Sequence, residues 1–167
     1  MAKVIRVELT NESINNAIKE VKAYKKWVLE KEAELRKRLA TLGATVASIS
    51  FSRAIYSGTN DVTVRVEDNG RTATIYAEGK SVAFIEFGTG DKYGHGHPQN
   101  DKFGVGPGTW SDNPDLGGKG HWDNPNGWYY GHNKHTFGSP PSMSMWSAVQ
   151  AITEQMTDIA KEVFREN

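Results

Sequence analysis

The sequence predicts an α+β fold: a long N-terminal helix, an antiparallel β-sheet built on a hairpin, and a C-terminal amphipathic helix. Apolar residues recur at helical spacing in the first 50 residues and again after residue 144, and a stretch of strict apolar–polar alternation lies between them. The order helix, hairpin, helix is typical of α+β proteins. With 167 residues, the chain is expected to form a single domain, 1–167.

The first helix is expected to run from about residue 11 to about residue 50. Its apolar positions recur every seven residues: Ile14, Val21, Val28, Leu35 and Leu42. Thr10 or Asn11 can cap its start. A helix of this length measures roughly 60 Å. Either Gly43 kinks it, or one end projects beyond the sheet and needs a partner.

The hairpin is expected over residues 61–77. Valines alternate in its first half and Ala73, Ile75 and Ala77 alternate in its second half, and Asn69-Gly70 between them favours a tight primed turn. The sequence VAFIEF follows at residues 82–87, and its pattern fits either a third strand or a single helical turn.

The closing helix is expected to begin near Ser139-Pro140-Pro141, which offers a cap and an early proline. Steps of four and three residues then trace one apolar face: Met145, Val149, Ile152, Met156, Ile159 and Val163. We expect this face to pack on the sheet and on the first helix.

Composition excludes several classes of function. The formal net charge is zero and the chain has no cysteine, so it offers no general attraction to nucleic acid or anionic lipid, and no disulfide or thiolate chemistry. The N-terminal residues lack an apolar signal region, and no run approaches about 18 apolar residues. We therefore expect a protein that folds in a cytosol and has no membrane partner.

Residues 90–138 are expected to form a long loop insertion. Thirteen of the seventeen glycines and all five histidines fall between residues 88 and 138, and aliphatic residues are nearly absent there. Such a stretch cannot form an ordinary core, yet it carries aromatic residues that disordered segments usually lack. These are the residues we expect at a subunit interface: Trp110, Trp122, Trp128, Tyr129 and Tyr130.

The histidines suggest a metal site, but their spacing is not specific. The candidate ligands are His95, His97, His121, His132 and His135. No cysteine or closely spaced carboxylate completes a known ligand pattern, so we expect neither a metal nor another cofactor. Two alternatives use the same segment. A metal-dependent nuclease toxin would use the histidines, although Lys134 is the only cation between residues 121 and 135. A carbohydrate-binding module would use the tryptophans.

Glu86 is the one carboxylate inside the apolar sequence VAFIEFGTG, and it could be a catalytic acid, a metal ligand or a structural anchor. No second acid lies at a recognisable spacing, so general acid–base catalysis is poorly supported. The chain also lacks a G-x-S-x-G nucleophile elbow and a phosphate-binding loop motif. We expect Glu86 to be an anchor that accepts hydrogen bonds from the amides of the following turn, or that pairs with a lysine or arginine.

VAFIEFGTG, placed between a hairpin and a Gly/Pro-rich insertion, resembles the EFGT-type motif of the phage tail-component family. This family is also described as the head–tail joining, neck or minor capsid proteins of tailed phages. The matching motif residues are Phe84, Glu86, Phe87, Gly88, Thr89 and Gly90. A second match is Pro140-Pro141 followed by Met145 and Ala148, at the start of the last helix. The order of elements is also similar. The chain departs from the family at Ser144, where many members carry a bulky aromatic residue, and in the greater length of its insertion.

The resemblance implies a non-enzymatic structural subunit of a phage or phage-tail-like particle, acting in head–tail joining, the neck or tail completion. The implied partners are further copies of the chain in a homo-oligomeric ring, with a hexamer among the possible sizes, and neighbouring connector or tail-tube and terminator proteins. The genome could pass through such a ring without sequence-specific contact. The implied location is the virion or tail-like particle, assembled in the host cytoplasm.

Overall fold

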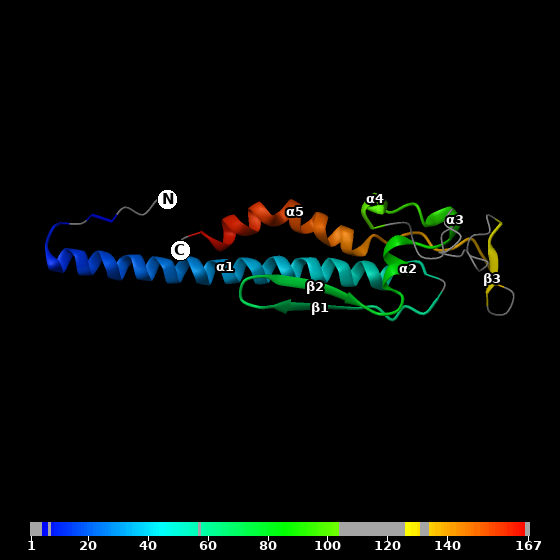
Figure 1. Cartoon of the computed structure of the whole chain (residues 1–167), viewed down its shortest axis with the longest axis horizontal. Coiled ribbons are helices and arrows are strands. Elements are labelled where there is room, and N and C mark those ends of the chain that lie inside the picture. The colour runs from blue at the N-terminus through cyan, green and yellow to red at the C-terminus, as the bar shows by residue number, and fades with distance from the viewer. Residues whose placement is uncertain (1–4, 7, 57, 104–125, 131–133, 166–167) are drawn as a thin grey trace.

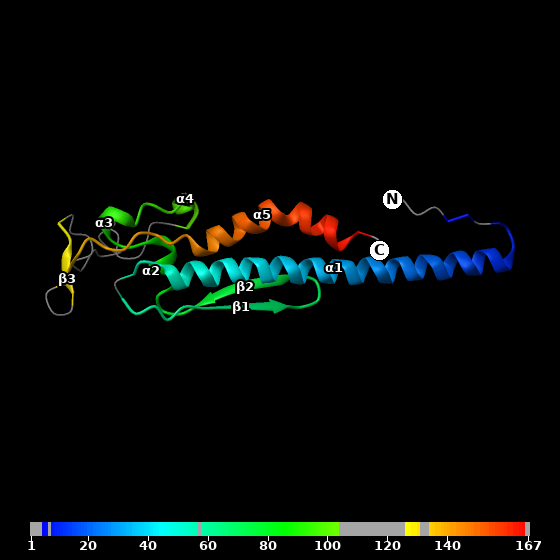
Figure 2. The ribbon, with the colours of Figure 1, turned by 180° about the vertical axis from the view of Figure 1, so that it is seen from behind.

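The computed structural model describes residues 5–6, 8–56, 58–103, 126–130 and 134–165. It confirms the α+β class. Helix α1 (Asn11–Arg53) lies between a two-stranded hairpin on one side and helix α5 (Ser144–Val163) on the other (Figures 1 and 2). None of the helices in these residues is both long and apolar enough to cross a membrane.

Helix α1 forms the long axis of the molecule. Thr10 caps it by accepting a hydrogen bond from the Ser13 amide at 3.2 Å, as the sequence predicts. The 43 residues of the helix correspond to about 65 Å. The helix continues through Gly43, and its N-terminal part extends past both the hairpin and α5 (Figure 1). Of the two expected outcomes, the structure therefore shows a projecting end.

Small residues on the C-terminal half of α1 allow two layers to approach it closely. Ala40, Gly43 and Ala47 are buried there. A methyl group on Gly43 would lie 2.6 Å from the Cδ1 atoms of both Ile75 in the hairpin and Ile152 in α5. Both contacts are too short for real carbon atoms, so Gly43 serves close packing.

The hairpin consists of β1 (Thr63–Asp68) and β2 (Ala73–Glu78), which pair antiparallel with Val66 opposite Ile75. In the turn, Gly70 has a φ of 86°, and Met143 is the only non-glycine residue with positive φ in the described part of the chain. The turn therefore differs from the type I′ form, which needs two such residues. The Asn69 side chain instead accepts hydrogen bonds from the amides of Arg71 and Thr72.

The hydrophobic core lies where α1, α2 and α5 meet. Its buried residues are Ala47, Phe51, Ile85 and Ala148. Ile85 belongs to α2 (Val82–Phe87), so the sequence VAFIEF is helical and does not form a third strand. The apolar face expected on α5 is only partly covered, since Val163 is buried whereas Val149 and Met156 are exposed.

The insertion contains more regular structure than a plain loop. Short helices α3 (Gly90–Tyr93) and α4 (Asn100–Phe103) follow α2. Strand β3 (Trp128–Tyr130) then pairs antiparallel with β4 (Lys134–Thr136). The sequence did not predict these elements because each is too short to show a periodic pattern.

Helix α5 begins later than expected. Ser139 is not its cap; the cap position is Met143, in a left-handed conformation with φ 53° and ψ 37°. The backbone of Ser139 is engaged with Thr89, and the amides of Ser142 and Met143 donate to the carbonyl oxygens of Ile85 and Glu86. Residues 139–143 therefore run along the end of α2 before the helix can start.

Candidate functional site

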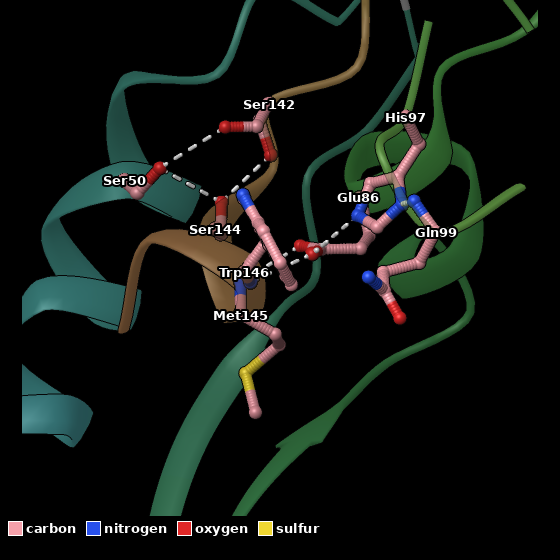
Figure 3. Close-up of polar contacts among 8 residues, drawn as sticks. All are labelled: Ser50, Glu86, His97, Gln99, Ser142, Ser144, Met145 and Trp146. Carbon is pink, nitrogen blue, oxygen red and sulfur yellow. Dashed lines mark hydrogen bonds and ion pairs between the residues drawn. The ribbon is translucent and has the colours of Figure 1, made fainter. Parts of the chain in front are cut away.

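Glu86 connects the motif helix α2 to the first turn of α5. Its side chain is buried, and its Oε2 and Oε1 atoms accept hydrogen bonds from the amides of Met145 and Trp146 at 2.9 and 3.1 Å (Figure 3). Amides in the first turn of a helix have no partner within the helix, and they favour a negative charge. Glu86 therefore caps a helix that begins 58 residues later in the chain.

His97 supplies the third contact of this carboxylate. Its Nε2 atom lies 3.3 Å from Glu86 Oε1, and its Nδ1 atom accepts a hydrogen bond from the Gln99 amide at 3.1 Å. Because Nδ1 accepts a hydrogen bond, it carries no hydrogen, so the ring hydrogen lies on Nε2 and is donated to Glu86. The His97 ring also packs on Phe87, with 4.4 Å between the ring centres.

The expected partners of Glu86 are therefore wrong, although the carboxylate is buried and fully engaged. Neither the amides of the Gly88-Thr89 turn nor a lysine or arginine bonds to it among the contacts that the structure gives. The Thr89 amide instead donates to the Ser139 carbonyl oxygen at 2.9 Å. The partners of Glu86 lie far away along the chain, where local reasoning could not identify them.

The rest of the motif joins the two ends of the insertion. The Ser139 amide donates to Thr89 Oγ1 at 2.8 Å, in addition to the bond from the Thr89 amide to Ser139. Gly88 and Gly90 both have a φ of 77°, which disfavours other residues. A side chain on Gly88 would also lie 2.8 Å from the nitrogen of Pro141. The glycines of the motif thus permit close contact between residues 88–90 and 138–141.

Three serines form a second polar cluster that sequence reasoning missed. The Ser144 hydroxyl is fully buried; it lies 2.6 Å from the Ser142 hydroxyl and donates to Ser50 Oγ in α1 at 3.0 Å (Figure 3). The small Ser144 side chain allows the start of α5 to lie directly against α1.

An open cavity of about 500 Å³ lies beside Glu86 and His97. We call it the α2–α5 socket. Its walls are mainly apolar and include Val82, Phe87, Phe103, Met145, Trp146 and Val149, and Lys102 also lines it. Since both carboxylate oxygens of Glu86 accept internal hydrogen bonds, the socket is suited to apolar groups rather than to a polar ligand.

A second carboxylate supports the start of α2. Asp61 accepts hydrogen bonds from the amides of Lys80 and Ser81, both at 2.9 Å. These backbone bonds stabilise the charged form and lower the pKa of Asp61 to about 2. Asp61 thereby connects the end of the hairpin to the motif helix.

The three histidines that the structure describes do not lie together. His97 is buried against Glu86, whereas His95 and His135 are exposed, and His121 and His132 lie outside the described residues. Among the residues that the structure places, no three histidine, aspartate or glutamate side chains are grouped as metal ligands would be. Phe84, the first residue of the motif, contacts Tyr56, with 6.5 Å between the ring centres.

The aromatic residues expected at a subunit interface are only partly described. Trp128, Tyr129 and Tyr130 form strand β3. Trp110 and Trp122 lie outside the described residues, so the interface expected for this group stays a prediction.

A comparison with protein-family models, curated proteins and solved structures gives no match to this chain.

Proposed function

We propose that this chain is a non-enzymatic structural subunit of a phage or phage-tail-like particle, and that it forms a homo-oligomeric ring in the head–tail joining, neck or tail-completion region. The proposal starts from the similarity of its EFGT-type motif and element order to the phage tail-component family. The neighbours of this ring in the particle would be connector proteins, or tail-tube and terminator proteins.

The observation that supports this proposal best is the way Glu86 is used. The oxygens of its carboxylate accept three internal hydrogen bonds, from Met145, Trp146 and His97. A catalytic acid or a metal ligand needs an atom directed at its substrate or metal. The motif therefore fits an architectural role, in which it fixes the start of α5 and closes the insertion at Thr89 and Ser139.

The test is to purify the full chain and determine its mass by native mass spectrometry, with negative-stain electron microscopy of the same sample. We expect discrete oligomers with a central opening. A strictly monomeric protein that cleaves DNA when Mg²⁺ or Zn²⁺ is added would refute the proposal and favour the nuclease alternative. A monomer that binds polysaccharide would favour the carbohydrate-binding alternative.

A further inference from the structure

The projecting part of α1 carries an apolar surface that the described part of the chain leaves uncovered. Ile14, Ile18 and Val21 are 40%, 47% and 55% exposed. They are spaced at i, i+4 and i+7, so they lie on one face of the helix. We call these three residues the α1 stripe.

The described residues before α1 do not cover this stripe. Its residues Ile5 and Glu8 lie over a different side of the helix, in a hollow formed with Ser13, Ala17 and Glu20. The hairpin and α5 also end before they reach it (Figure 1). Aliphatic side chains at this i, i+4, i+7 spacing, partly exposed on an otherwise charged helix, form a pattern seen in helices that bind in an apolar groove.

The α2–α5 socket is a suitable groove on the same chain. Phe103 and Val149 on its wall are 62% and 51% exposed, and the cavity volume of about 500 Å³ is large enough for aliphatic side chains. A further apolar hollow among the described residues, between α1 and residues 140–142, also contains Arg53 and three serines. It is a poorer match to an all-aliphatic stripe.

The stripe and the socket cannot meet within one molecule. The socket contacts the first turns of α5, and Ser144 there bonds to Ser50 near the C-terminal end of α1. Some 30 residues of continuous helix separate Ser50 from the stripe, which corresponds to about 45 Å. Only a second copy can bring the two surfaces together, and a net charge of zero gives no overall repulsion between copies.

We infer that the α1 stripe of one copy binds in the α2–α5 socket of the next copy. This contact uses two different surfaces, so each added copy leaves one stripe and one socket open. Assembly therefore stops when a ring closes, or continues as a filament if the geometry does not allow closure. A contact of three aliphatic side chains buries less than the roughly 1,200 Å² of a stable pairwise interface. Closure of a ring would therefore be needed for a stable assembly.

This inference rests on the self-association in the proposed function and names the surfaces that carry it. It can be tested with Ile18→Asp, which disables the stripe, and Val149→Asp, which disables the socket. Both side chains are about half exposed, so both variants are expected to fold. Circular dichroism of each variant checks this, and Phe103→Ser serves as a second socket variant.

Native mass spectrometry and sedimentation velocity then measure assembly. Each variant alone should need at least about tenfold more protein to assemble than the wild type, since a loss of about 1.4 kcal/mol already gives this factor. A mixture of the two should form no ring and only a weak 1:1 dimer at high protein concentration, because the one intact contact, between the stripe of the Val149→Asp chain and the socket of the Ile18→Asp chain, cannot close on itself. The matched control is Ile55→Asp. Ile55 is 76% exposed and belongs to neither the stripe nor the socket, so this variant should assemble normally.

Three results would overturn the inference. If the wild type forms rings and both variants assemble as well as it does, the contact is wrong while the proposed function stands. If Val149→Asp assembles alone and Ile18→Asp does not, α1 helices pair with each other instead. A wild type that is monomeric at all concentrations would overturn both the contact and the ring.

Discussion

The substitution Glu86→Ala removes the acceptor of three hydrogen bonds in a buried place. The amides of Met145 and Trp146 and the Nε2 atom of His97 would all lose their partner. An orphaned buried donor costs about 1–3 kcal/mol. Three such donors would cost about 3–9 kcal/mol if all stayed unpaired, and the lower part of this range applies where they reorient toward other partners. We expect the free energy of unfolding to fall by about 3–5 kcal/mol.

This loss can be measured by urea denaturation followed by circular dichroism, and it should lower the melting temperature by roughly 10 °C in a chain of this size. Glu154→Ala is the matched control, because it removes an exposed glutamate from α5, the helix that Glu86 caps, and should change stability by less than about 0.5 kcal/mol. Glu86→Gln keeps one acceptor oxygen and should give an intermediate loss. If Glu86→Ala and Glu154→Ala unfold at the same urea concentration, the capping role of Glu86 is wrong.

Four further outcomes are expected. Met143→Gly should raise the free energy of unfolding by up to about 1 kcal/mol in urea titrations, because glycine adopts the left-handed conformation without strain; a loss would show that the methionine side chain matters more. The lowered pKa of Asp61, about 2 against 3.8, means that its charged form stabilises the fold above pH 4 and that this stabilisation is lost as the pH falls through 2. The stability difference between wild type and Asp61→Asn should therefore shrink over that interval, and a constant difference from pH 6 to pH 2 would contradict it. The purified protein should bind no stoichiometric zinc and keep its melting temperature in chelator, whereas one equivalent of metal by elemental analysis would reveal a site. Trp122→Ala or Trp128→Ala should weaken assembly in a sizing assay while helix content stays normal; normal assembly with early unfolding would place these residues in the core of the monomer.

Local features of the fold were predictable from the sequence, whereas the contacts of the site were not. The Thr10 cap and the alternating hairpin depend on neighbouring residues, so the sequence shows them directly. The start of α5 was predicted too early because Ser139 resembles a helix cap, but its backbone bonds to Thr89. That bond exists only after the chain has folded back on itself.

The buried face of α1 shows a second limit of sequence patterns. Hydrophobic periodicity identifies large aliphatic residues, and in the N-terminal part of the helix these include Ile14 and Val21, which are exposed. Three of the four buried residues of the helix are instead Ala40, Gly43 and Ala47, which a hydrophobic pattern barely registers because they are small. His97 could have been paired with Glu86 only by knowing that α2 is a helix and that the chain turns back after it.

The closure of the insertion at Thr89 and Ser139 has a consequence for how the sequence of this protein can vary in evolution. Both backbone amides at the junction and the Thr89 hydroxyl are engaged with the opposite end, so the core holds the two ends at a fixed separation whatever chain joins them. The entropic cost of a longer connection then grows slowly, by about 0.6 kcal/mol for each doubling of its length. Apart from His97, which contacts Glu86, and the socket residues Lys102 and Phe103, the segment can therefore be replaced by one of another length and composition while α1, the hairpin and α5 keep their sequence. Selection can act on the segment and on the scaffold almost independently.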